Sequence, residues 1–216
     1  MAKVIHKQLL VPNFQLQFIV EPKIYSSSNQ EEILILPNHR GRLHNKSSIV
    51  KNVIDADAVI FNRFQPIVMQ TADCIPLVFF NPQSQKMGIL HIGFRNLKMS
   101  NFYQLIKALN NDLSNFQFII GPAICSNCYT HDSIIRKAKW LYLKSHFPKY
   151  AINHPKRGLI FDLRQATIDR LSQIRVEPDK IQNIMICSHE DLATSFHYNK
   201  KLTNRITTRI IQLDRD

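Results

Sequence analysis

Short apolar runs separated by polar corners dominate the first half of the chain. Residues 55–96 contain DADAVIF, QPIVMQTADCIPLVFF and KMGILHIGFRN, and apolar runs of about four to eight residues bounded by turn formers are typical of buried strands. Residues 8–20 predict one or two further short strands broken by Pro12 and Asn13, and residues 32–36 predict another. The first half is therefore expected to be mainly sheet.

Helical periodicity appears in the second half of the chain. It predicts helices over residues 96–113, 131–146 and 162–174, with strands at 116–120 and 181–187 and an edge strand or helical turn at 206–213. In the second helix, the residues expected to face the core are Ile134, Ile135, Ala138, Leu141 and Tyr142. Strands that come first and then alternate with helices predict an α+β fold, a mixed β-sheet layered with helices, in a single domain spanning residues 1–216.

Composition limits the class of protein. The 216 residues are 44% hydrophobic and 20% charged, as in folded globular proteins. No 18 apolar residues run together and no signal-peptide pattern begins the chain, so we expect a cytoplasmic protein without a membrane partner. Four dispersed cysteines suit a reducing compartment.

The net charge of +12 is compatible with an anionic partner such as a nucleotide, phosphate, nucleic acid or a membrane surface. The basic residues are scattered and form no tail or periodic helical stripe, so a solvated basic surface is favoured over a nucleic-acid interface.

Three residues that can bind a metal occupy predicted strand ends. Cys74 lies in the TADC corner, His91 ends the next apolar run, and His39 follows the strand at 32–36. If residues 81–85 form a hairpin turn, Cys74 and His91 return to the same end of neighbouring strands. Zinc favours a thiolate with imidazoles, and catalytic zinc sites keep three protein ligands and an open fourth position. Nine histidines and four cysteines also place such residues in loops by chance, and His44 competes with His39, so spacing alone leaves the site open.

Other polar residues near these corners have two interpretations each. Arg95 either binds a phosphate or pairs with a neighbouring aspartate, namely Asp55, Asp57 or Asp73. Asp73 either orients an imidazole or accepts hydrogen bonds from the backbone of its own corner. Cys125 and Cys128 form a CxxC, but no second CxxC accompanies it, so packing is favoured over a redox pair or half of a zinc site.

The block from TADC to HIGFRN, preceded by DADAVIF and followed by GPAICSNCY, resembles the YfiH-like family, also called the multicopper polyphenol oxidase (laccase) or purine nucleoside phosphorylase family. The resemblance runs from Glu32 to the C-terminus. It implies an α/β/α sandwich and a zinc ion, or alternatively copper, held by His39, Cys74 and His91 as the catalytic set. It also implies phosphorolysis of adenosine, inosine and methylthioadenosine, with purine nucleoside and phosphate as partners and deamination of adenosine as a companion activity.

The resemblance also implies substrate-binding residues. Arg95 matches the arginine of the family's HAGWRG motif, and Arg40 follows the histidine that stands in place of the one in QVHG. Phe196 and Tyr198 match the FFSY aromatics, which are expected to stack on the purine base. Cys187 matches the cysteine of the family's CT segment.

Several family motifs are altered in this chain. QVHG has become PNHR, WRG has become FRN, and the N-terminal R-x-GG-S and LNL motifs have no counterpart. The three residues expected to bind the metal are kept, whereas several of the residues expected to bind the anion and the ribose are replaced. Three alternatives therefore stay open: a copper phenol oxidase, an amide hydrolase of cell-wall precursors that uses Cys74 as nucleophile with His91 as base, and a non-catalytic binding module.

Overall fold

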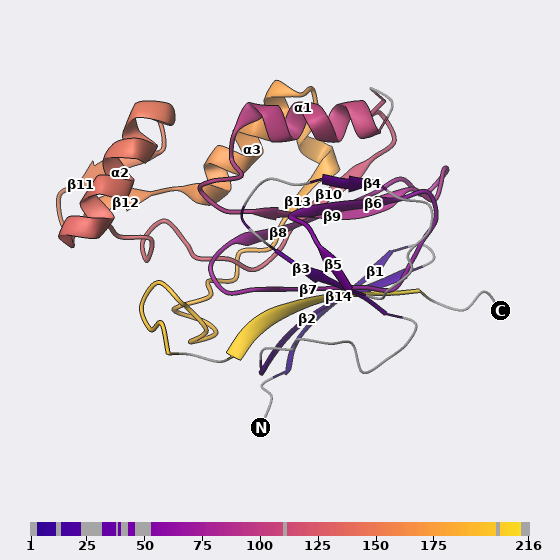
Figure 1. The fold of residues 1–216 in the computed structure, drawn as a ribbon, viewed down its shortest axis with the longest axis horizontal. Coiled ribbons are helices and arrows are strands. Elements are labelled where there is room, and N and C mark those ends of the chain that lie inside the picture. The colour runs from indigo at the N-terminus through magenta and orange to yellow at the C-terminus, as the bar shows by residue number, and fades with distance from the viewer. Residues whose placement is uncertain are drawn as a thin grey trace.

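The computed structural model describes residues 4–11, 14–22, 32–37, 39, 43–45, 53–109, 112–201 and 204–212. Most of its strands pair into two mixed sheets (Figure 1). The first sheet has the strand order β1-β2-β14-β7-β3-β5, comprising β1 Val4–Val11, β2 Phe14–Pro22, β14 Asn204–Gln212, β7 Ile67–Thr71, β3 Ile33–Leu36 and β5 Val53–Asp55. The second has the order β13-β10-β8-β9-β6-β4, comprising β13 Ile181–Asn183, β10 Gln117–Ile120, β8 Ile75–Phe80, β9 Met87–Ile92, β6 Ala58–Phe61 and β4 Leu43–Asn45.

The second sheet is apolar on both faces, and this determines the layers. Along β8, Leu77 and Phe79 pack toward the helices, while Val78 and Phe80 pack toward the first sheet. Successive side chains of a strand point to opposite faces, so the all-apolar run IPLVFF must be covered on both sides. Helices cover one side and the first sheet covers the other.

The α+β class with mixed sheets is confirmed. The α/β/α order of layers is replaced by a helix, sheet, sheet order, because a second sheet rather than helices covers the inner face of β8, β9 and β10. In Figure 1, α1 (Met99–Ala108) and α3 (Leu163–Gln173) lie above the second sheet, and α2 (Ile134–His146) lies beside the hairpin of β11 (Ala151–His154) and β12 (Gly158–Phe161). None of the helices in the described residues is long and apolar enough to cross a membrane.

Helix α2 packs through a different face from the one that its sequence predicts. Ile134 is 87% exposed and Leu141 is 62% exposed, whereas Trp140 and Leu143 are buried. The expected face was therefore wrong at Ile134 and Leu141, whereas Tyr142 packs against the core as predicted. Trp140 explains the rotation, since its indole both packs in the core and donates a hydrogen bond to the Ile160 carbonyl of β12 at 3.2 Å.

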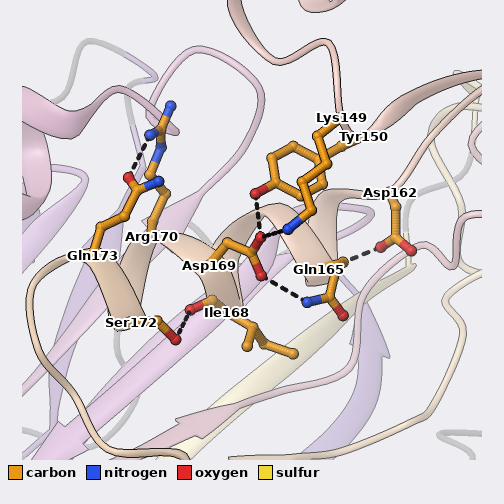
Figure 2. A network of polar contacts seen from close by, with 9 residues as sticks. All are labelled: Lys149, Tyr150, Asp162, Gln165, Ile168, Asp169, Arg170, Ser172 and Gln173. Atoms are coloured by element: carbon orange, nitrogen blue, oxygen red, sulfur yellow. Dashed lines mark hydrogen bonds and ion pairs between the residues drawn. The ribbon is translucent and has the colours of Figure 1, made fainter.

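Helix α3 lies within residues 162–174, where the sequence predicts a helix. The side chain of Asp162 caps its first turn by accepting from the Gln165 amide at 2.9 Å. Figure 2 shows Asp169 on the outer face of α3, where its carboxylate accepts from Lys149, Tyr150 and Gln165 and so ties the helix to the segment before β11. The opposite face of α3 buries Leu163, Ala166 and Leu171.

Five further elements differ from the predicted ones. The C-terminal segment forms strand β14, which lies between β2 and β7 in the interior of the first sheet, so an edge position or a helical turn was wrong. The β11–β12 hairpin and the short strand β4 were not predicted. Strands β4 (LHN) and β11 (AINH) carry few apolar residues, and the apolar run of β12 (GLIF) is only four residues long. A short 3-10 helix, η1 (Pro178–Lys180), leads into β13.

Candidate metal centre

Strand pairing brings the three predicted ligands together. Strands β3 and β7 are parallel neighbours, so their carboxyl ends, which lead to His39 and Cys74, lie at the same edge of the first sheet. Strands β8 and β9 form the predicted hairpin, in which Pro76 pairs with His91, so Cys74 lies two residues from the partner of His91. The ligand atoms of His39, Cys74 and His91 all lie within 4.8 Å of one another.

One buried carboxylate holds both histidines. Asp57 Oδ1 lies 3.0 Å from Nδ1 of His91 and accepts a hydrogen bond of 2.9 Å from the backbone amide of His39. Strand pairing places Asp57 beside His91, whose own amide donates to the Asp57 carbonyl at 2.7 Å. With Nδ1 engaged, Nε2 is the nitrogen of His91 left to bind a metal.

His39 has a backbone conformation that residues other than glycine rarely adopt. Its φ is 59°, in the left-handed region. Such a conformation costs on the order of 1 kcal/mol and persists only where neighbouring groups impose it, as the hydrogen bond from its amide to Asp57 does. This conformation turns the chain after β3. The imidazole of His39 then packs edge to face against that of His91, with ring centroids 4.6 Å apart.

Gly93 leaves room for the sulfur of Cys74. A Cβ atom at position 93 would lie 2.8 Å from Cys74 Sγ, well inside van der Waals contact. The glycine of the HIGFRN segment therefore allows the thiol to lie against the backbone that follows β9.

Charges within this group favour a cation. Burial alone would keep His91 neutral, but the Cys74 thiolate and the hydrogen bonds to Asp57 and Cys74 outweigh it and raise the pKa of His91 to about 9. Desolvation and the positive charge of His91 lower the pKa of His39. His91 therefore holds a proton beside Cys74 and Asp57 at neutral pH, and a metal ion would displace that proton on binding.

The three ligands open into a cavity of about 390 Å³. Its walls come from the end of β3, from the corner of residues 71–74 and from two residues far along the chain, Phe196 and Arg205. Arg205 precedes Ile206, which pairs with Thr71, so strand register brings its guanidinium to the rim. The same guanidinium lies over the Phe196 ring, 5.7 Å from its centroid.

The segment of residues 187–201, which carries Phe196, is attached to the Cys74 corner through Asp73. The carboxylate of Asp73 accepts from the Ser188 hydroxyl at 2.8 Å and from the His197 amide at 2.7 Å. Asp73 therefore neither orients an imidazole of the candidate centre nor bonds the backbone of its own corner, because its carboxylate binds a distant segment. The residue that orients an imidazole is Asp57.

Two basic residues of α2 also approach this region. Arg136 donates to the His197 carbonyl, and Lys139 donates to the Tyr129 hydroxyl while lying over the rings of Phe94 and Tyr129. Burial lowers the pKa of Lys139 to about 8, against the nearby negative charges of Cys74 and Asp73. Sequence reasoning missed both residues, although their spacing of three positions on a predicted helix placed them on one face.

Not every predicted substrate-binding residue reaches the cavity. Phe196 lines it, but Tyr198 stacks on His189 instead, with centroids 3.7 Å apart. Arg95 is exposed, lies against Phe94 and is absent from the cavity wall, although its charge contributes to the lowered pKa of His39. Arg40 and the side chain of His44 lie outside the described residues.

The donor set fits a zinc ion. One thiolate and two imidazoles from three chain segments are typical ligands of catalytic zinc, one imidazole has the carboxylate partner that such histidines usually have, and the group faces a cavity. The fold and this group define a mixed two-sheet protein with a Cys-His-His cluster at the sheet edge.

Comparison with known proteins identifies the family. The model of the family described as multi-copper polyphenol oxidoreductase laccase matches residues 27–213, so the chain belongs to that family, the YfiH-like proteins. The hypothetical protein YfiH of Bacillus licheniformis superposes with a TM-score of 0.70 at 16% identity, covering 93% of each chain. YlmD from Geobacillus stearothermophilus superposes with a TM-score of 0.67 at 17% identity, covering 86% of this chain and 74% of that one. These likenesses show the fold.

Curated relatives carry a functional name. A purine nucleoside phosphorylase of Staphylococcus saprophyticus is 27% identical over 138 residues, which cover 64% of this chain and 52% of the relative. A purine nucleoside phosphorylase of Staphylococcus aureus strain N315 is 25% identical over 132 residues, covering 61% and 49%. The chain therefore spans about half the length of the curated relatives that it matches.

Proposed function

We propose that this protein is a zinc-dependent purine nucleoside phosphorylase that acts on adenosine, inosine and methylthioadenosine and also deaminates adenosine. The observation that carries the proposal is the convergence of His39, Cys74 and His91 at the wall of a cavity of about 390 Å³. The names of the curated relatives suggest the reaction class, and a zinc ion on these three ligands would supply the Lewis acid for that reaction.

The residues of the cavity have distinct roles in this proposal. His39, Cys74 and His91 hold the zinc, which when bound acts as a Lewis acid toward an oxygen of the substrate. Phe196 offers a ring face on which the purine base can stack. Arg205 at the rim supplies a positive charge for phosphate, with Arg95 nearby, and Asp57 fixes the orientation of His91.

Phosphate-dependent release of hypoxanthine from inosine by zinc-loaded protein tests the proposal. We expect His91→Ala to abolish release, because the variant lacks a ligand, while His146→Ala, which changes an exposed histidine at the end of α2, retains it. The same protein should convert adenosine to inosine. Absence of hypoxanthine release from zinc-loaded wild-type protein that retains its circular dichroism spectrum would refute the phosphorylase proposal.

A copper phenol oxidase is the alternative that the family description suggests. Multicopper oxidases need several histidine-rich copper sites, whereas the His/Cys clusters in the described part of the chain include two histidines, His39 and His91. We therefore expect no oxygen uptake with a phenol after copper loading. Blue absorbance together with oxygen uptake would favour the oxidase instead.

Alkylation of Cys74 distinguishes the zinc-dependent phosphorylase from the hydrolase alternative, in which Cys74 is the nucleophile and His91 its base. A thiolate bound to zinc should react slowly with iodoacetamide until a chelator is added, whereas a free thiolate paired with an imidazolium should react at once. Peptide mass mapping at Cys74 distinguishes the two.

A further inference from the structure

A second group of metal-type ligands lies outside the cavity, where the corner after β10 meets the segment after β13. It consists of Cys125, Cys128, Cys187 and Glu190, whose ligand atoms all lie within 4.8 Å of one another. We propose that these four side chains bind a structural zinc ion, separate from the one at Cys74.

Backbone hydrogen bonds bring the two segments together without any metal. Ala123 and Cys187 form an isolated parallel β-bridge. In it the Ala123 amide donates to the Ile186 carbonyl at 3.2 Å, and the Ser188 amide donates to the Ala123 carbonyl at 3.1 Å. Residues 125–128 then form a turn, in which the Cys128 amide donates to the Cys125 carbonyl at 3.1 Å. This turn places the thiols of Cys125 and Cys128 on the side that faces Cys187. The ligands are thus preorganised.

The donor set is that of a closed zinc site. With zinc–sulfur bonds of about 2.3 Å, tetrahedral ligand atoms lie about 3.8 Å apart, so separations of up to 4.8 Å need only small side-chain rotations. Cys125 Sγ lies 3.7 Å from Glu190 Oε2, already near that spacing. Four protein ligands leave no open position, which is typical of a structural ion rather than a catalytic one.

Burial raises the pKa of the Cys125 and Cys128 thiols, so a zinc ion would have to displace their protons on binding, and nearby donors would then stabilise the anionic sulfur. The backbone amide of Cys125 donates to Cys187 Sγ at 3.4 Å. The buried guanidinium of Arg164 donates to the carbonyls of Ala123 and Ile186, which lie two residues before Cys125 and one residue before Cys187. A positive charge there offsets the net negative charge that three thiolates and a carboxylate retain after binding one zinc ion.

This ion would fix the base of the segment that lines the cavity. Cys187 and Glu190 begin residues 187–201, in which Ser188 and His197 bind Asp73, and Phe196 reaches the cavity wall. The sequence favoured packing for Cys125 and Cys128 because only two ligands were visible locally. The other two come from about sixty residues later, and their convergence on the CxxC becomes visible in the Ala123–Cys187 bridge and in the contacts of Cys125 with Cys187 and Glu190.

Zinc content in a variant that lacks the first site tests this inference independently of the proposed enzyme activity. In reduced full-length protein carrying Cys74→Ser and His91→Ala, we expect about one zinc per chain after desalting, and loss of that zinc when Cys187→Ser is added. Cobalt substitution should give a near-ultraviolet thiolate-to-cobalt absorption that disappears with the same change. No bound zinc in the double variant, or zinc that survives Cys187→Ser, would overturn the inference.

A milder variant covers the case in which Cys187→Ser does not fold. Glu190 is exposed, so Glu190→Gln should preserve the fold while weakening zinc retention against a chelator by about tenfold or more. Glu177→Gln, at another exposed glutamate, is the matched control and should retain zinc as the double variant does. Equal retention in Glu190→Gln would contradict the four-ligand site.

Discussion

Asp57 is the residue on which the geometry of the candidate metal centre depends most. Its carboxylate orients the ring of His91 and the backbone of His39 at the same time, and it is fully buried. The sequence offered Asp57 only as one of three partners for Arg95. A hydrogen bond between residues 34 positions apart has no local signal, so only the pairing of β6 with β9 shows it.

Asp57→Asn should weaken zinc binding at the candidate centre by about 10- to 100-fold, because the amide keeps the shape but loses the charge that supports the imidazole. Competition with a chelator measures the affinity. Asp179→Asn, at an exposed aspartate in η1, is the control and should bind as the wild type does. Equal affinity in Asp57→Asn would show that the carboxylate does not support the metal.

Two histidines beside the site should make the protein less stable in acid. Burial, with the positive charge of Lys139, lowers the pKa of His131 to about 3, and burial, with Arg136, lowers that of His197 to about 4. Unfolded histidine titrates near about 6.5, so below that pH the unfolded chain binds more protons than the folded one. The stability that these two histidines contribute is therefore complete above about pH 6.5 and is lost as the pH is lowered toward 4, whereas the contribution of His91, whose pKa is raised, is lost as the pH rises toward 9.

Urea unfolding at pH 7 and pH 5 measures this loss. His131 alone should contribute up to about 1.4 kcal/mol per pH unit, and His131→Phe should reduce the dependence by that amount. A pH dependence unchanged in His131→Phe would contradict the assigned pKa.

At the scale of elements, the periodicity of apolar residues predicted where the main helices and buried strands lie. It did not predict which face of α2 is buried. Ile134 and Leu141 lie seven positions apart and so share one face of a helical projection, yet tertiary contacts bury Trp140 and Leu143. Sequence alone could not predict this rotation, because it depends on the β11–β12 hairpin against which α2 packs.

A pair of leucines tests the orientation of α2. Leu143→Ala should lower the free energy of unfolding by about 2–5 kcal/mol, since it leaves a cavity in the core. Leu141→Ala, two positions earlier and exposed, should change it by less than about 0.5 kcal/mol. Chemical denaturation of both variants distinguishes the observed face from the predicted one, and a larger loss in Leu141→Ala would contradict the structure.

At the scale of the whole molecule, the candidate centre is a product of topology. His39, Cys74 and His91 are far apart along the chain, and they converge because β3 and β7 are parallel while β8 and β9 form a hairpin. Strand ends and residue types were predictable from the sequence. The contribution of Arg205 to the same cavity depends on the interior position of β14, and that of Phe196 depends on the hydrogen bonds from Ser188 and His197 to Asp73. Neither has a local signal in the sequence.

A crystal of the zinc-loaded protein, measured at the zinc absorption edge, tests the central claim most directly. The account predicts an anomalous peak in the cavity at about 2.0–2.3 Å from one ring nitrogen each of His39 and His91 and from the sulfur of Cys74. A cavity without a peak in zinc-replete crystals, or a sulfur of Cys74 turned away from both imidazoles, would contradict it.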